Sequence, residues 1–133
     1  MTAEITYNEQ LRTSAKHLRS GNSIINDAPV DNHGKGEAFS PTDMVATALG
    51  TCILTIMGIS AQKNDIDMEG AKAEITKVMA SAPRRIAKIE AIIKMPQKNY
   101  SDQEKQLLER ALDNCPVCRS LHPDMEQDIQ IIW

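Results

Sequence analysis

Three cysteines are the residues of this sequence with the most evident chemistry. Cys115 and Cys118 lie three positions apart in the stretch NCPVCRSLHPD, and Cys52 lies within a long apolar segment. Cysteines in such settings serve as redox pairs, as metal ligands or as small buried side chains. The choice among these roles depends on the elements that hold the three thiols.

The C-x-x-C pair is predicted at the start of a short helix over residues 116–122, with Pro116 at its first position. Cys115 directly precedes Pro116, where unpaired backbone N–H groups and the helix dipole stabilise a thiolate. Cys118 falls in the first turn of this helix and shares the stabilisation less directly. This is the arrangement that disulfide oxidoreductases use.

Cys52 is predicted in the middle of a helix, on its apolar stripe. Its neighbours Thr51 and Ile53 are uncharged, so nothing close to it in the sequence lowers the pKa of its thiol. On these residues alone, Cys52 is typical of a buried core thiol, because free cysteine is among the most buried residue types.

A zinc site is a second interpretation of the same residues. Cys115, Cys118 and His122 form a C-x2-C-x3-H pattern, and a fourth ligand could come from Cys52, His33 or His17. Structural zinc sites usually carry a second ligand pair at short spacing, which this sequence lacks. Attached haem would need a histidine directly after the C-x-x-C pair, where an arginine stands. We therefore expect no metal and no bound cofactor.

The elements that position the thiols are predicted from hydrophobic periodicity and capping residues. Alternation over 3–10 and 11–18 predicts two strands, followed by a turn at 19–23 and a polar loop at 27–39. A long apolar helix then begins at Pro41, capped by Ser40 and Asp43, and ends near residues 63–64.

The second half repeats the pattern of strands before helices. Strands are predicted at 70–80 and 84–96, a helix at 101–114 that starts with the capping box of Ser101 and Glu104, and a closing strand at 128–133. The order predicts a single α+β domain over 1–133, with a mostly antiparallel sheet packed on the long central helix. The wide apolar surface of that helix suggests a dimer.

Composition excludes several classes of partner. The 133 residues carry a net charge of −3 without a basic cluster, so a nucleic-acid partner is not expected. The N-terminus lacks the order of a signal peptide, and three cysteines suit a reducing cytoplasm. Residues 44–61 carry no charge over a length that could just span a bilayer. Their threonines, glycines and capped start favour a buried central helix, so no membrane is expected.

Two stretches together resemble the OsmC/Ohr family, the osmotically inducible and organic hydroperoxide resistance proteins. FSPTDMVATALGTCILTI is similar to the central-helix motif of the family, which has a Ser/Asn-Pro start, a run of small residues and a Cys eleven positions after the Pro. Pro41 and Cys52 match that spacing. NCPVCRSLHPD resembles the second signature, a Cys-Pro-Val followed by a short helix. With the element order, the resemblance covers nearly the whole chain.

This resemblance implies an intertwined homodimer with two thiol sites at the subunit interface. In the family, the central-helix Cys attacks the terminal oxygen of an organic hydroperoxide, and the second Cys condenses with the resulting sulfenic acid. An external dithiol then reduces the disulfide. By motif match, Cys52 is the peroxidatic thiol and Cys115 the resolving thiol. The resolving partner stops the oxidised sulfur from climbing to sulfinic acid, and apolar surroundings would favour organic peroxides over hydrogen peroxide.

The sequence departs from the family pattern at three points. The best-characterised members activate the peroxidatic thiol with an Arg held by a Glu one residue after the Pro, and Thr42 stands at that position. Asp43 is adjacent, but one helical step turns a side chain by about 100°, and capping explains it. For the activating Arg, Arg12 is the first candidate and Arg19 the second; an exposed strand arginine is the alternative for Arg12.

The third departure is Cys118, at a position where many relatives carry serine or another residue. It opens a route in which Cys115 pairs with Cys118, or it is incidental. His122 could orient a thiolate, or pack near a helix end.

Three functions remain open from the sequence. The first is a cysteine-based peroxidase that reduces organic hydroperoxides in oxidative-stress defence. The second is a protein of the same fold that acts in thiol redox chemistry or binds a small ligand, with weak or no peroxidase activity; Thr42 favours it. The third is a zinc-stabilised structural module.

Overall fold

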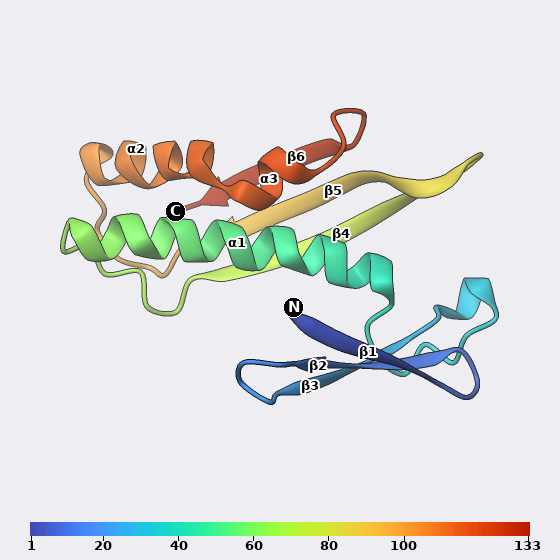
Figure 1. The fold of residues 1–133 in the computed structure, drawn as a ribbon. Coiled ribbons are helices and arrows are strands. Elements are labelled where there is room, and N and C mark those ends of the chain that lie inside the picture. The colour runs from blue at the N-terminus through green and yellow to red at the C-terminus, as the bar shows by residue number, and fades with distance from the viewer. The chain divides into compact units, whose positions relative to one another are not determined.

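Strands and helices follow one another in nearly the order that the sequence predicts (Figure 1). The computed structural model describes residues 1–133 and contains two three-stranded sheets and a long central helix, which confirms the α+β fold class. The chain divides into two compact units, Met1–Val45 and Ala46–Trp133. A single domain over 1–133 stays a prediction.

The N-terminal unit contains an antiparallel sheet in the order β1-β2-β3. Its strands are β1 (Ala3–Asn8), β2 (Arg12–His17) and β3 (Ser23–Asp27). Strand β3 was not predicted, because Ile24 and Ile25 are adjacent and hide the alternation that reveals a strand. Part of the predicted polar loop is a short 3-10 turn, Val30–Asn32.

Helix α1 (Pro41–Lys63) begins where its capping residues predict. The backbone N–H of Asp43 donates to Ser40 Oγ at 3.1 Å, and the N–H of Ser40 donates to Asp43 Oδ2 at 2.8 Å. This reciprocal pair satisfies two backbone donors at the helix start. The helix ends at the predicted place, with Asn64 Nδ2 donating to Ser60 O at 2.8 Å.

The C-terminal unit holds the second sheet and the shorter helices. Its elements are β4 (Lys72–Ser81), β5 (Arg84–Lys94), α2 (Asp102–Ala111), a 3-10 turn (Leu112–Asn114), α3 (Pro116–Ser120) and β6 (Glu126–Ile132). Strands β4 and β5 form the predicted antiparallel hairpin, whereas β6 pairs with β5 in parallel, Ala91 lying opposite Ile129. The capping box of Ser101 and Glu104 starts α2 as predicted.

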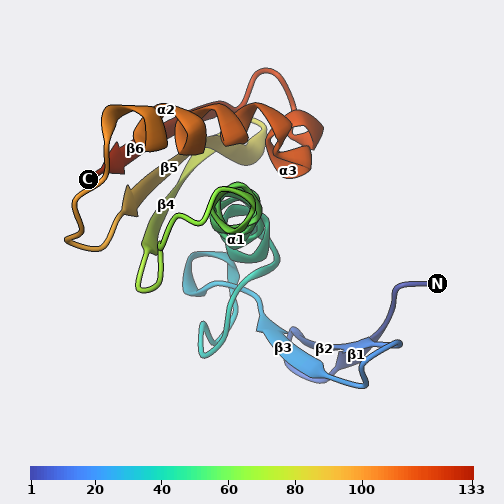
Figure 2. The same cartoon turned by 90° about the vertical axis from the view of Figure 1, so that its left-hand side faces the viewer.

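The core of this unit lies between one face of the sheet and the helices α1 and α2 (Figure 2). Alternate residues of β5 supply the sheet side, and α1 and α2 supply the other. The fully buried apolar side chains are Leu49, Ile53, Met57, Ile89, Ala91, Ile93 and Leu108. Gly50 lets α1 approach β4 closely, because a Cβ at that position would lie 2.7 Å from Ile75 Cδ1.

By length and composition alone, α1 is also long and apolar enough to cross a membrane. Within this chain, 33% of its most apolar stretch is buried. Val45 and Ile59 remain 37% and 45% exposed. The helix therefore keeps apolar surface that the C-terminal unit does not cover.

Candidate functional site

The middle of α1 and the start of α3 bring two of the three cysteines into contact. The Sγ atoms of Cys52 and Cys115 lie 3.0 Å apart and share a hydrogen bond. All three cysteines are free thiols. Cys115 is fully buried, whereas Cys52 is half-buried and packs at the border of the core. Of these two thiols, Cys52 is therefore the one more open to a reagent from solution.

Cys115 occupies the N-cap position of α3, with Pro116 as the first residue of the helix. Its sulfur accepts a hydrogen bond from the backbone N–H of Cys118 at 3.4 Å. Its own N–H donates to Leu112 O at 3.0 Å, which links it to the preceding 3-10 turn. The backbone thus holds the Cys115 sulfur from both sides.

The two thiols in contact have pKa values shifted in opposite directions. Burial raises the pKa of Cys52, and the hydrogen bond with Cys115 raises it further. Burial also acts to raise the pKa of Cys115. The hydrogen bonds from the Cys118 N–H and from the Cys52 and Cys118 thiols outweigh it, so the pKa of Cys115 is lowered. Cys115 is therefore the more acidic thiol of the pair.

Cys118 belongs to the same cluster. Its thiol is half-buried against the core, and its backbone N–H donates to the Cys115 sulfur. Burial, and then the hydrogen bond and charge of Cys115, raise the pKa of Cys118 to about 12. Gln127 Nε2 from β6 donates to Cys118 O at 2.9 Å and fixes this turn of backbone. Sequence reasoning missed Gln127, whose partner lies in another element.

The candidate activating residue Arg12 lies in the N-terminal unit, at the start of β2. Its Nε donates to Asp27 Oδ1 at 2.6 Å, and its Nη2 donates to Asp27 Oδ2 at 2.8 Å and to Glu37 Oε2 at 2.7 Å. These hydrogen bonds raise the pKa of Arg12 and lower the pKa of Asp27. The Asp27 side chain is only 2% exposed. Arg12 is therefore held in one orientation by two carboxylates that the sequence analysis did not single out.

The accessory candidates near the helix start have local roles. Asp43 caps α1, as its position predicts. The Oγ1 of Thr42, where the family pattern has Glu, lies 3.1 Å from Ser40 Oγ. Arg19, the second candidate arginine, is exposed in the turn between β2 and β3. None of these contacts involves a thiol.

His122 lies in the turn between α3 and β6 with its side chain 70% exposed. Its Nδ1 accepts a hydrogen bond from the backbone N–H of Asp124 at 3.1 Å. No three His, Cys, Asp or Glu side chains of residues 1–133 come together in a way that could hold a metal ion. The residues of the C-x2-C-x3-H pattern therefore do not assemble as zinc ligands, and the contacts of His122 are those of a turn residue.

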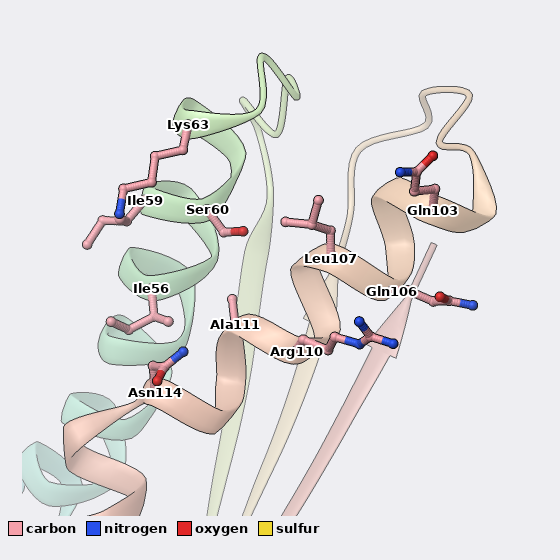
Figure 3. A pocket seen from close by; sticks show the side chains of 10 residues that line it. All are labelled: Ile56, Ile59, Ser60, Lys63, Gln103, Gln106, Leu107, Arg110, Ala111 and Asn114. Carbon is pink, nitrogen blue, oxygen red and sulfur yellow. The ribbon is translucent and has the colours of Figure 1, made fainter.

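A cavity of about 570 Å³ opens between α1 and α2 (Figure 3). Ile56 lines it one helical turn after Cys52, on the same face of α1, and Asn114 lines it directly before Cys115. Leu107 points from α2 toward α1 and gives the cavity an apolar side chain, together with Ile56 and Ala111. The rest of the lining is mostly polar, and its charged groups are Lys63 and Arg110. The cavity can accept an apolar group on the side of Ile56, one helical turn from Cys52.

Comparison with known proteins agrees with this geometry. The profile described as OsmC-like protein matches residues 34–130. A protein of Psychrobacter arcticus 273-4, named as an osmotic stress induced and detoxification response protein, has 48% sequence identity and a TM-score of 0.94; the match covers 99% of this chain and 96% of that one. No curated protein matches the chain.

More distant solved structures share the fold. An OsmC-like protein of Mycoplasma pneumoniae has 17% identity and a TM-score of 0.81, over 98% of this chain and 94% of that one. The organic hydroperoxide resistance protein OsmC of Legionella pneumophila has 12% identity and a TM-score of 0.76, over 100% and 98%. Both the profile and the 48% identical relative show that this chain belongs to the OsmC-like family.

Proposed function

We propose that the protein is a thiol-dependent peroxidase that reduces organic hydroperoxides to alcohols in defence against oxidative stress. The observation that carries the proposal is the contact between Cys52 and Cys115, whose sulfurs are 3.0 Å apart. One sulfur of the contact is accessible and the other is fully buried. That is the division of labour that a peroxidatic and a resolving thiol require.

In the first step, Cys52 gives up its proton to a water molecule as the hydroperoxide approaches. The Cys52 thiolate attacks the terminal oxygen, the O–O bond breaks, and the alkoxide leaves as the alcohol after taking a proton. Cys52 becomes a sulfenic acid. The Cys115 sulfur then attacks the Cys52 sulfur, and the hydroxyl group leaves as water. A hydroperoxide and two thiols thus yield an alcohol, water and one disulfide, which an external dithiol reduces.

The cavity between α1 and α2 supports an organic substrate. Its apolar lining begins one turn from Cys52, so a hydrocarbon group can lie there while the peroxide oxygen contacts the sulfur. Hydrogen peroxide has no hydrocarbon group that could occupy this cavity. We therefore propose organic hydroperoxides as the substrates.

Arg12 is proposed as the cation that favours the Cys52 thiolate during the reaction, as the family resemblance implies. Asp27 and Glu37 hold its guanidinium by three hydrogen bonds. We propose that these two carboxylates orient Arg12 as Glu does in the family pattern, where this chain has Thr42. Arg12→Lys keeps the charge but loses the fork of donors, and should lower the rate of hydroperoxide consumption.

The N-terminal sheet supports a homodimer. Ile5, Ala15 and Ile24 lie opposite one another across the three strands and share a face. Ile5 is 64% exposed and Tyr7 66% exposed, and a cavity of about 430 Å³ opens on this face. We propose that a second copy of the chain covers it, as in the intertwined dimer that the resemblance implies. Light scattering should then give twice the chain mass of 14.7 kDa.

We place the reaction in the cytoplasm, because the reducing thiol pool of that compartment keeps cysteines free and supplies dithiols. The proposal needs no bound cofactor, since the oxidant and the reductant both come from solution. It likewise involves neither nucleic acid nor membrane.

The test is the consumption of cumene hydroperoxide with dithiothreitol as the reductant. The wild-type chain should consume it, and Cys52→Ser should lower the rate at least about hundredfold because the attacking sulfur is lost. Thr55→Ala, an exposed position one turn along α1, is the matched control and should keep the wild-type rate. A Cys52→Ser variant with full activity would overturn the proposal.

A redox or small-ligand-binding protein without strong peroxidase activity is the second candidate. The raised pKa of Cys52 favours it, because a protonated thiol is a poor nucleophile. In that case the wild-type chain would leave cumene hydroperoxide unconsumed. It would still form a disulfide between Cys52 and Cys115 with the thiol oxidant diamide.

A further inference from the structure

The thiol contact described above involves two of the three cysteines, yet the third touches the same sulfur. The Sγ of Cys115 lies 3.0 Å from Cys52 Sγ and accepts a hydrogen bond from the backbone N–H of Cys118 at 3.4 Å. Cys52 and Cys118 are both half-buried, whereas Cys115 is fully buried between them. The buried sulfur is thus the shared neighbour of two more accessible ones.

We propose that Cys118 is a third redox-active thiol, which takes the disulfide over from Cys52 by attacking the Cys115 sulfur. The proposal rests on the peroxidase function and deepens it, because it names the residue on which the external dithiol acts. Cys52 is then the thiol that meets the hydroperoxide. The Cys115–Cys118 pair is the disulfide that meets the reductant.

The exchange conserves atoms and electrons. Cys118 loses its proton to water, and its sulfur attacks Cys115 Sγ in the Cys52–Cys115 disulfide. The Cys115–Cys118 bond forms, the Cys52–Cys115 bond breaks, and Cys52 leaves as a thiolate that is then protonated. The external dithiol next reduces the Cys115–Cys118 disulfide by two electrons and two protons, and becomes a disulfide itself.

The geometry of α3 is compatible with this pairing. Side chains three positions apart on a helical turn have Cβ atoms about 5–6 Å apart, a little beyond disulfide range, so a small adjustment brings them together. The hydrogen bond from Gln127 to Cys118 O and the bond from Arg119 N to Cys115 O at 3.3 Å hold the two ends of this turn. The partners are therefore kept adjacent throughout the cycle.

The protonation of Cys118 follows the redox state of Cys115. In the reduced chain, burial and the charge of Cys115 raise the pKa of Cys118 to about 12, so Cys118 stays protonated and does not compete for the hydroperoxide. Once Cys115 is bonded to Cys52, its sulfur is uncharged. The causes that depend on Cys115 then disappear, so the pKa of Cys118 falls although burial still raises it, and Cys118 is a better nucleophile than in the reduced chain.

The test follows the disulfide by peptide mapping after one equivalent of cumene hydroperoxide, acid quenching at successive times, and alkylation of free thiols. Trypsin leaves Cys115 and Cys118 together on residues 111–119 and Cys52 on residues 36–63. At the earliest times we expect peptides 36–63 and 111–119 to be joined by the disulfide between Cys52 and Cys115. An unalkylated 111–119 peptide with an internal disulfide should follow, while Cys52 becomes open to alkylation. A cross-link that persists, with no internal disulfide at any time, would overturn the proposal.

The kinetic test compares the first turnover with steady-state turnover on dithiothreitol. Cys118→Ser should lower the ratio of the steady-state rate to the first-turnover rate by about tenfold or more. Cys118→Ala should give the same ratio, and Ser120→Ala, an exposed position on α3, should leave the ratio of the wild-type chain unchanged. A wild-type ratio in both Cys118 variants would contradict the inference, since a purely structural role would slow both phases together.

Failure of the inference is distinguishable from failure of the peroxidase proposal. If the wild-type chain does not consume cumene hydroperoxide, the peroxidase proposal is overturned. The same mapping after oxidation with diamide then tests the exchange alone. Transfer of the disulfide from residues 52 and 115 to residues 115 and 118 would support the proposed exchange. A Cys52–Cys115 disulfide that persists at all times would contradict it.

Discussion

The middle of α1 and the start of α3 offer two settings for a thiol, and they differ although their sulfurs touch. At Cys52, burial and the neighbouring sulfur raise the pKa; at Cys115, hydrogen-bond donors outweigh burial and lower it. In mid-helix the backbone N–H groups are committed to the helix, whereas the first N–H groups of a helix are free. The comparison teaches that two touching thiols differ in acidity because hydrogen-bond donors outweigh burial at the start of α3 and do not outweigh it in the middle of α1.

The division has a functional counterpart. The more acidic Cys115 is fully buried, and the less acidic Cys52 is the more accessible of the two. Cys52 is thus placed to meet a reagent from solution, and Cys115 is placed to meet an oxidised Cys52.

The largest expected effect comes from removing the resolving thiol, Cys115. In Cys115→Ser, one equivalent of cumene hydroperoxide should leave Cys52 as a sulfenic acid with no partner. The sulfenic acid reagent dimedone should then label residues 36–63 almost completely, whereas the wild-type chain should be labelled little. Further peroxide should convert Cys52 to sulfinic acid, visible as a mass increase of two oxygens.

The reciprocal variant is the control for that experiment. Cys52→Ser exposes only Cys115 and Cys118 to the peroxide, and dimedone should label neither. Labelling at Cys115 in this variant would mean that the more acidic, buried thiol is the attacking one, and it would reverse the assignment of roles.

A moderate effect should come from moving α1 itself. A Cβ at Gly50 would lie 2.7 Å from Ile75 Cδ1, so Gly50→Ala should destabilise the chain by about 1–3 kcal/mol through overpacking. Gly58→Ala is the matched control in the same helix, where the nearest atom is Met68 Sδ at 4.0 Å. It should stabilise by about 0.5–1 kcal/mol because alanine favours the helix.

Urea unfolding measures both glycine variants. Gly50 lies half a turn from Cys52. If Gly50→Ala also slows formation of the Cys52–Cys115 disulfide, the position of α1 controls the contact between the two thiols. Equal stability changes at positions 50 and 58 would contradict the close approach of α1 to β4.

The smallest effect concerns the pKa values themselves. In a Cys118→Ser background, Cys52→Ala removes a donor to the Cys115 sulfur, so the pKa of Cys115 should rise. In the same background, Cys115→Ala removes a hydrogen bond and a charge that raise the pKa of Cys52, so that pKa should fall. Each variant keeps one thiol. The pKa of that thiol is measured from the thiolate absorbance at 240 nm as a function of pH. Shifts of the same sign in both variants would break the comparison.

Much of the fold was predictable because its signals are local. Ser40 with Asp43, and Ser101 with Glu104, mark two helix starts through contacts over three residues. The parallel pairing of β6 was not predictable, since its partner β5 is chosen by the packing of α2 and α3 between them. Strand β3 was hidden by its adjacent isoleucines.

The candidate site was likewise predictable only where its signals are local in the sequence. Spacing within two motifs singled out Cys52 and Cys115, and their contact follows only when α1 and α3 pack together. The carboxylates that hold Arg12 stand 15 and 25 positions away in the sequence, so no local pattern could connect them. The direction of each thiol pKa depends on hydrogen-bond donors from a neighbouring turn, and these exist only in the folded chain.

The short distance between the Cys52 and Cys115 sulfurs limits how much the shape of the protein can change with its redox state. The two atoms are 3.0 Å apart in the reduced chain, and a disulfide is about 2.05 Å long, so closing the bond requires a movement of about one ångström. No segment has to unfold, and the oxidised chain should keep nearly the shape of the reduced one. Such a molecule is suited to consuming an oxidant quickly, and poorly suited to signalling its presence through a change of shape.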